Sequence, residues 1–232
     1  MKGNFQYINA GLAVALTKEW LSKHRKLDFP DSSLSREFIE GLRKCFWPGR
    51  CQVLDSKKAT NLRFFIDGAH TEESIQECVN WFITETENKT NVTLCLVFSC
   101  SITRNPVTLL SHINRSDLPF SSVIFCPFEL DRPHTAGIKS LEDMFKESGI
   151  SPSVPYSTDS KSTWIERQAQ VWSCLTCSSH KPLTLKSASE SIHYLESLAE
   201  SLPDKQLCVL VTGSLYLVGS ILKALNFSFS SE

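Results

Sequence analysis

Short, nearly continuous runs of apolar residues recur along the chain and alternate with amphipathic stretches. The four clearest runs are Leu62–Ile66, Val92–Phe98, Ser122–Cys126 and Leu207–Val211. Runs of this length are typical of parallel strands that are buried on both faces. The pattern therefore predicts strands at these four places, within a sheet of about five or six strands.

Between the runs, apolar residues recur three or four positions apart, as they do in helices with one buried face. Such stretches lie at 74–84, 141–145, 164–175 and 192–202. Strands alternating with helices favour an α/β fold, which here means a Rossmann-like, mostly parallel sheet with helices on both faces. We see no internal repeat and no coiled-coil heptads.

The N-terminal part of the chain has a different pattern. Residues 1–27 form a helical pattern whose apolar face carries Leu12, Ala13, Leu16, Trp20 and Leu21. A loop follows around Pro30, and 35–45 predict a second short helix. We therefore divide the chain into an N-terminal helical segment (1–27), a linker with a short helix (28–46) and the α/β region (47–232).

Composition narrows the possible functions. The chain has 232 residues, 41% of them hydrophobic and 21% charged, with a formal net charge of −1. This balance is ordinary for a globular protein and argues against a nucleic-acid binder or an anionic-membrane binder. The most apolar tract, Leu207–Leu225, is interrupted by Gly213, Gly219 and Lys223, so it predicts a strand, a glycine turn and a helix rather than a membrane span.

The chain has nine cysteines, an odd number with no secretory signal before them. Several lie in or beside apolar runs, where a free cysteine behaves as a small buried hydrophobe. One C-x-x-C, Cys174 to Cys177, lacks the second pair that a structural zinc site needs. Free thiols in a reducing compartment are therefore the favoured interpretation, and no metal ligands are assigned.

Two short motifs carry the candidate chemistry. The first is W-P-G-R-C-Q at 47–52, in which a Pro-Gly turn projects Arg50. The second is I-D-G-A-H-T at 66–71, which predicts a strand end at Asp67, a glycine turn and a helix start near His70. In open α/β sheets ligands bind at the carboxyl ends of strands, and a helix start offers N–H groups to phosphate. An Asp, a His and an Arg at one place therefore predict polyphosphate and metal chemistry.

Each candidate residue has a functional and a structural interpretation. Arg50 can bind phosphate oxygens with its planar guanidinium, or it can be a surface arginine paired with Asp67 or Glu72. Asp67 can accept hydrogen bonds from ribose hydroxyls, or it can hold the turn through backbone N–H groups. His70 can act as a neutral hydrogen-bonding ring at the helix start, or it can merely cap the helix together with Thr71.

The paired motifs W-P-G-R-C-Q and D-G-A-H-T resemble the C-terminal domain of folylpolyglutamate synthases, which are Mur-ligase-type enzymes. The resemblance runs from about Asn4 to Phe227, and three further stretches support it. These are G-N-F-Q-Y-I-N-A-G-L-A at 3–13, E-R-Q-A-Q-V at 166–171 and V-T-G-S-L-Y-L at 211–217. It implies that 1–27 are the end of the central ATPase domain, although Phe5 stands where the family usually has histidine.

The resemblance implies ATP-dependent addition of L-glutamate to the γ-glutamyl tail of reduced folates. It places Arg50, Asp67 and Asn9 in nucleotide binding and makes His70 the candidate catalytic residue, although Asn9 can equally be an exposed helix residue. ATP and Mg²⁺ would be held mainly by upstream domains, because the sequence contains no G-x-x-x-x-G-K-[ST].

The resemblance further implies that the partners are reduced folate polyglutamate and L-glutamate, with no nucleic acid and no membrane. We expect a monomer in the cytoplasm or the mitochondrion. We expect the isolated chain to lack ligase activity, because it holds only one side of the phosphate clamp. The alternative is a non-catalytic, stand-alone remnant that binds a nucleotide or a partner.

Overall fold

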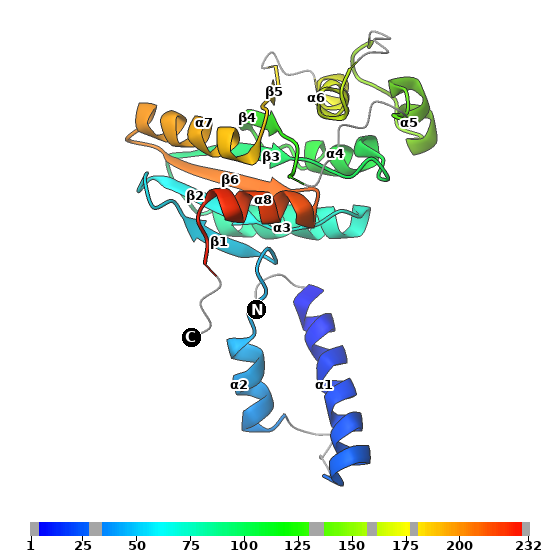
Figure 1. The fold of residues 1–232 in the computed structure, drawn as a ribbon, viewed down its shortest axis with the longest axis vertical. Helices are drawn as coiled ribbons and strands as arrows, with labels where there is room; N and C mark the ends of the chain where they lie inside the picture. The colour runs from blue at the N-terminus through cyan, green and yellow to red at the C-terminus, as the bar shows by residue number, and fades with distance from the viewer. Residues whose placement is uncertain (1–4, 28–33, 130–136, 157–161, 177–180, 229–232) are drawn as a thin grey trace.

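The structure is a computed structural model that describes residues 5–27, 34–129, 137–156, 162–176 and 181–228. Within these ranges one six-stranded sheet forms the centre of the molecule (Figure 1). The first residues of the 3–13 stretch, the predicted loop around Pro30 and Cys177 lie outside the described residues.

The strands are β1 (Gln52–Asp55), β2 (Leu62–Ile66), β3 (Val92–Phe98), β4 (Phe120–Phe125), β5 (Leu183–Thr184) and β6 (Gln206–Thr212). Their order across the sheet is β1-β2-β6-β3-β4-β5, and every neighbouring pair is parallel except β1 with β2. All four predicted strands are confirmed. Strand β4 begins two residues earlier and ends one residue earlier than expected, and β6 extends one residue further at each end. The mostly parallel sheet is confirmed as well.

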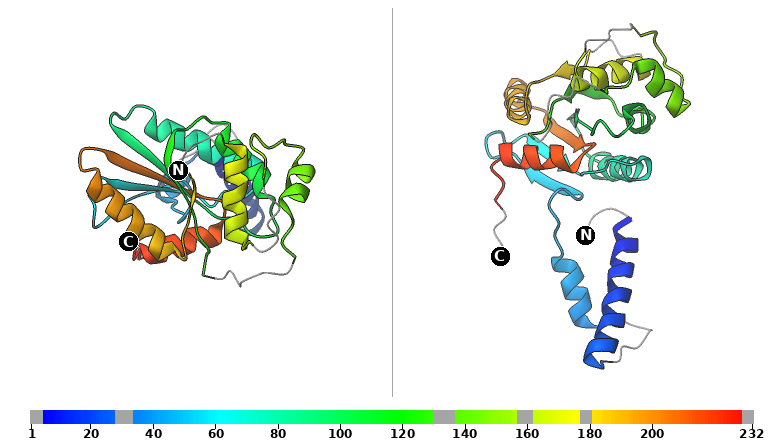
Figure 2. Two further views of the ribbon diagram at one scale, coloured as in Figure 1. Left: turned by 90° about the horizontal axis from the view of Figure 1, so that it is seen from above. Right: turned by 45° about the vertical axis from the view of Figure 1, so that its right-hand side comes forward.

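The helices are α1 (Phe5–Arg25), α2 (Arg36–Lys44), α3 (Glu72–Thr86), α4 (Pro106–Asn114), α5 (Leu141–Ser148), α6 (Trp164–Leu175), α7 (Ala188–Ser201) and α8 (Leu215–Ala224). One face of the sheet packs on α3 to α6 and the other on α7 and α8 (Figures 1 and 2). The sequence pattern did not single out α4, which begins with an Asn105 cap and Pro106 in its first turn. None of the helices in the described residues is long and apolar enough to cross a membrane.

Side chains of successive strand residues point alternately into two hydrophobic cores, one on each face of the sheet. In β2, Phe65 faces α3, whereas Phe64 and Ile66 face the core under α7 and α8, and all three are fully buried. Burying each of these side chains contributes roughly 1.5–3 kcal/mol. Because both faces of the strand are covered, four of its five residues are apolar and only Arg63 is polar, and this is why the run was recognisable as a parallel strand.

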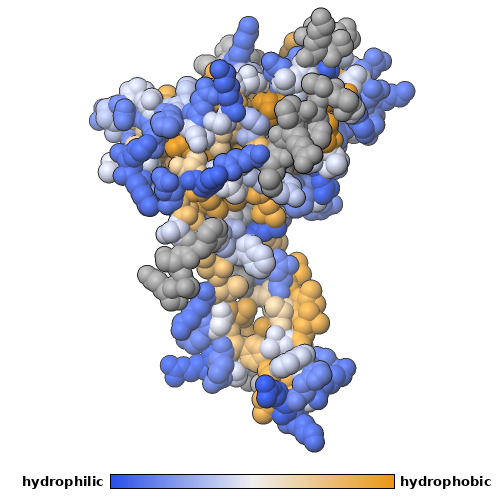
Figure 3. Space-filling model, viewed as in Figure 1, coloured by the Kyte–Doolittle hydropathy of each residue, from blue (hydrophilic) through white to orange (hydrophobic). Residues whose placement is uncertain are grey.

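Helices α1 and α2 stand apart from the sheet and its covering helices (Figure 1). Neither helix contains a buried residue. Large apolar side chains along α1 are exposed, among them Ile8 at 77%, Leu12 at 61% and Leu16 at 63%. Figure 3 shows hydrophobic residues gathered along this helix pair and at its junction with the body. Of the predicted apolar face of the first helix, Leu12, Ala13, Leu16 and Trp20 are exposed and only Leu21 is half-buried.

Candidate functional site

A cavity of about 960 Å³ lies where α1 and α2 meet the sheet. Asn9, Arg50 and His70 all line it, although they come from three separate parts of the chain. Asp67 lies beside Arg50 but is itself only 2% exposed. The structure thus brings the four predicted residues to one region, where β2 ends at Ile66.

The Pro-Gly turn before β1 has a tightly constrained backbone. Gly49 has φ +74°, and a Cβ atom there would lie 2.4 Å from Cγ1 of Val218, so only glycine fits. Cys51 has φ +44°, which is uncommon for a residue with a side chain. Arg50 lies between these two residues, and its own N–H donates to the carbonyl oxygen of Trp47 at 3.1 Å.

Asp67 holds this turn. Its Oδ2 accepts the backbone N–H of Cys51 at 2.8 Å, across 16 residues of sequence. Burial raises the pKa of the Asp67 carboxyl above its usual value, while the Cys51 N–H and the Arg50 guanidinium act in the opposite direction. Because the Asp67 carboxylate is buried and accepts a backbone N–H of this turn, its contacts match the structural interpretation.

Arg50 supplies the positive charge of the cavity. It is the only Lys or Arg among the described residues that line the cavity, and its side chain is 32% exposed. Its Nη1 lies 4.0 Å from Oδ1 of Asp67, which is too long for a hydrogen bond. The other proposed partner, Glu72, lies instead 3.3 Å from Nε2 of His112. The guanidinium thus has a nearby counter-charge but keeps N–H groups for an anion.

His70 precedes α3 and has a defined tautomer. Its Nδ1 lies 2.8 Å from the carbonyl oxygen of Gly68, which can only accept, so Nδ1 carries the proton. In the neutral ring Nε2 is then an acceptor. The backbone N–H of His70 donates to Oγ of Ser74 at 3.0 Å. The ring is thereby fixed at the cavity wall in an orientation that leaves one nitrogen for a ligand.

The start of α3 satisfies part of its own N–H groups. Thr71 and Ser74 form a capping box, in which Thr71 Oγ1 accepts the Ser74 N–H while Ser74 Oγ accepts the Thr71 N–H. Fewer donors remain for phosphate than the motif alone suggested. Arg50 is therefore the side chain of this cavity best suited to an anion.

Asn9 is an exposed residue of α1 whose Nδ2 donates to Oε1 of Gln6 at 3.2 Å. It lines the same cavity as Arg50 and His70, and apolar neighbours Phe5, Ala10 and Ala13 lie on the same helix. The position is compatible both with a ligand contact and with an ordinary surface residue, as the sequence already left open.

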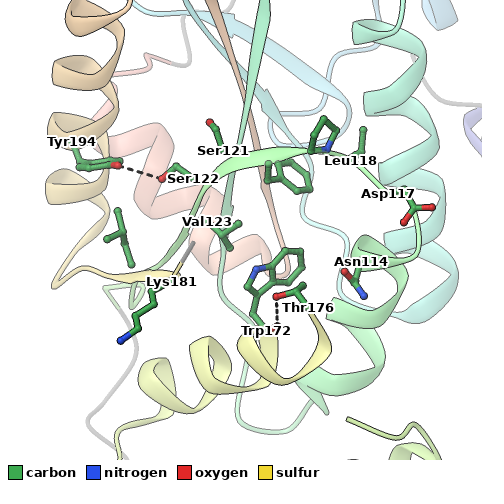
Figure 4. Close-up of a pocket in the computed structure, with 13 residues that line it drawn as sticks. Asn114, Asp117, Leu118, Ser121, Ser122, Val123, Trp172, Thr176, Lys181 and Tyr194 are labelled. Atoms are coloured by element: carbon green, nitrogen blue, oxygen red, sulfur yellow. Dashed lines mark hydrogen bonds between the residues drawn. The ribbon is translucent and has the colours of Figure 1, made fainter. Parts of the chain in front are cut away.

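Outside this site the structure adds three observations. The eight described cysteines form no disulfide with one another, and burial raises the pKa of the Cys51 and Cys78 thiols, which disfavours thiolate chemistry. No group of three or more His, Cys, Asp or Glu in the described ranges could hold a metal ion. A second cavity of about 470 Å³ lies at the start of β4, between Trp172 and Tyr194, and shares no lining residue with the first (Figure 4).

Two residues of the site were not singled out from the sequence, Gln52 and Ser74. Gln52 is 3% exposed and its Oε1 accepts the Gly49 N–H at 2.8 Å. A signal existed for each of them: Gln52 is a polar residue inside the first motif, and Ser74 lies three residues after the N-cap Thr71, where a capping box needs a polar side chain.

The sheet order and the position of the cavity define the class: an open α/β domain with a cavity beside the carboxyl end of β2. The chain is 28% identical over 243 residues to a "Putative folylpolyglutamate synthase" of Caenorhabditis elegans, covering 96% of this chain and 43% of that protein. It is also 28% identical over 279 residues to the "Folylpolyglutamate synthase" of Arabidopsis thaliana, covering 97% of this chain and 46% of that protein.

Among solved structures, the fold is similar to that of the Mycobacterium tuberculosis folylpolyglutamate synthase complexed with ADP and AMPPCP. The TM-score is 0.58 at 17% identity, and the match covers 98% of this chain and 41% of that chain. No protein-family model matches. The chain is therefore similar to the C-terminal portion of folylpolyglutamate synthases, and it spans less than half the length of the curated relatives it matches.

Proposed function

We propose that this chain is the C-terminal, nucleotide-contacting part of an ATP-dependent ligase that adds L-glutamate to the γ-glutamyl tail of reduced folates. The observation that carries the proposal is the single cavity shared by Asn9, Arg50 and His70. The names of the similar proteins, and the ADP and AMPPCP complexes of the M. tuberculosis enzyme, support the same assignment.

The residues of the cavity fit a nucleotide. A volume of about 960 Å³ is in the range of small-molecule sites. The apolar residues of α1 on its wall suit a base, and the Arg50 guanidinium suits a phosphate. In a ligase of this kind ATP supplies the phosphoryl group that activates the substrate carboxylate. Arg50 would orient and stabilise the phosphate charge, and the free Nε2 of His70 would accept a hydrogen bond at the same wall.

The described residues contain no group of three or more His, Cys, Asp or Glu side chains that could hold a magnesium ion. In the proposed enzyme the metal would be held by the upstream region that the longer relatives possess, together with the phosphate-binding loop that this sequence lacks. The second candidate function is a non-catalytic protein that binds a nucleotide or a partner.

A chimaera distinguishes the two functions. The matching C-terminal part of the C. elegans relative is replaced with this chain, and ATP-dependent glutamate incorporation into a reduced folate is measured. We expect the chimaera to be active and the isolated chain to be inactive, because phosphate clamps from both sides carry much of the catalysis. A folded but inactive chimaera, beside an active parent enzyme, would instead support the non-catalytic function.

A further inference from the structure

Gln52 is a buried polar residue with only half of its hydrogen-bonding capacity used. It is the first residue of β1 and is 3% exposed. Its Oε1 accepts the Gly49 N–H at 2.8 Å, while its Nε2 has no hydrogen-bond partner among the described residues. Burying an unpartnered amide group costs free energy. The bond to Gly49 is therefore the contact that accounts for a glutamine at this place.

The bond from the Gly49 N–H to Gln52 is one of four hydrogen bonds that hold the turn around Arg50, counting the bond from the Arg50 N–H to the carbonyl oxygen of Trp47 described above. The carbonyl oxygen of Gly49 accepts the Gly68 N–H at 2.9 Å. On the other side of Arg50, the Cys51 N–H donates to Asp67 at 2.8 Å. Both residues that flank Arg50 are thus anchored, and both have positive φ angles, which is ordinary for Gly49 but uncommon for Cys51.

The Arg50 side chain is not anchored to the same degree. Its ion-pair partner, Asp67, lies 4.0 Å from Nη1, and a third of the side chain is exposed. The direction of the guanidinium therefore depends on where the backbone places its Cα–Cβ bond. That placement depends in turn on the bonds to Gly49 and Cys51.

We propose that Gln52 is a positioning residue of the anion site, which holds the Gly49 N–H so that Arg50 points into the cavity. The proposal rests on the proposed function, since it is a nucleotide phosphate that Arg50 would meet there. Without this bond the turn around Arg50 samples other conformations. A phosphate that binds must then also order Arg50, and this cost reduces its binding free energy.

Two substitutions separate the hydrogen bond from packing. Gln52→Met keeps the length of the side chain but removes the acceptor. Gln52→Glu keeps an oxygen for the Gly49 N–H and should restore the bond. The matched control is Gln168→Met in α6: Gln168 is fully buried and accepts the Cys100 N–H at 2.9 Å, so it loses an equivalent bond far from Arg50 in the sequence.

The first measurement needs no ligand. In nitrogen-15 NMR of the full 232-residue chain, amide exchange of Gly49 and the order parameter of the Arg50 Nε–H group are recorded. We expect Gln52→Met to speed Gly49 exchange by about tenfold or more, the factor for about 1.4 kcal/mol of lost protection, and to lower the order of Arg50. Gln52→Glu should restore both values, and Gln168→Met should change neither.

The second measurement is the affinity for ADP by calorimetry. Gln52→Met should weaken binding by about two- to tenfold, the scale of ordering one long side chain. In an Arg50→Ala background the same substitution should have no further effect, because Gln52 acts through Arg50.

Unchanged Gly49 exchange and Arg50 order in Gln52→Met, or an equal change in Gln168→Met, would overturn the positioning role. An equal loss of ADP affinity with and without Arg50 would overturn it too. If the unmodified chain shows no ADP binding, nucleotide binding by this chain is refuted, and the ligand-free measurement still decides the role of Gln52.

Discussion

Removing the Asp67 carboxylate should destabilise the fold, and the structure sets the size of the loss. Asp67 is 2% exposed and accepts the Cys51 N–H at 2.8 Å. In Asp67→Ala that donor stays buried without a partner, which costs about 1–3 kcal/mol. At about 2–4 °C per kcal/mol for a chain of this size, the melting temperature should fall by about 2–12 °C. The loss is partly offset because a buried carboxylate is removed.

The comparison with Asp67→Asn isolates the cause. Asparagine keeps an oxygen that can accept the Cys51 N–H but carries no charge, so we expect a loss below about 1 kcal/mol. The control is Asp55→Ala, since Asp55 is exposed and its ion pair with Arg63 is worth only about 0–1 kcal/mol. Stability is measured by urea unfolding with linear extrapolation. A loss below about 0.5 kcal/mol in Asp67→Ala, or equal losses in the alanine and asparagine variants, would refute the reasoning.

Three further outcomes follow from the same geometry. Arg50→Ala should weaken ADP binding by about 1.5–3 kcal/mol in calorimetry while the melting temperature stays within about 2 °C, and an unchanged affinity would contradict the phosphate role. Burial raises the pKa of Asp67, so at a given pH the folded state binds more protons at this group than the unfolded state does. The stability that protonation of Asp67 contributes is complete below its unfolded pKa near 3.8 and is lost as pH rises through its folded pKa. Asp67→Asn should therefore gain stability relative to the unmodified chain across that window in pH-dependent urea unfolding, and parallel curves would argue against it. Gly213→Ala should lower the free energy of unfolding by about 2 kcal/mol or more, since φ is +106° and a Cβ atom would lie 2.6 Å from the Ser99 carbonyl oxygen. Gly149→Ala should lower it by about 1 kcal/mol, since φ is +66° but the space around the residue is open. Equal losses in urea unfolding would show that the close contact at Gly213 does not matter.

The elements that the sequence revealed share one physical property. Strands β2, β3, β4 and β6 are covered on both faces, so burial leaves a continuous apolar run that is visible without tertiary information. Strand β1 (Gln52–Asp55) and the two-residue β5 were missed because they are short and lie at the edges of the sheet. Their pairing depends on neighbours that are distant in sequence, and no local pattern encodes it.

The sequence by itself determined the α/β class, the order of most elements and the two motifs that carry Arg50, Asp67 and His70. The similarity to folylpolyglutamate synthases confirms the resemblance, while the roles of Arg50, Asp67 and His70, the domain boundaries and the compartment stay predictions. Only the tertiary structure decided what each residue contacts. Asp67 could have faced a ligand or the chain, and its bond to Cys51, 16 residues away, places it with the chain. Such choices depend on the burial and direction of side chains, which arise only when remote segments pack together.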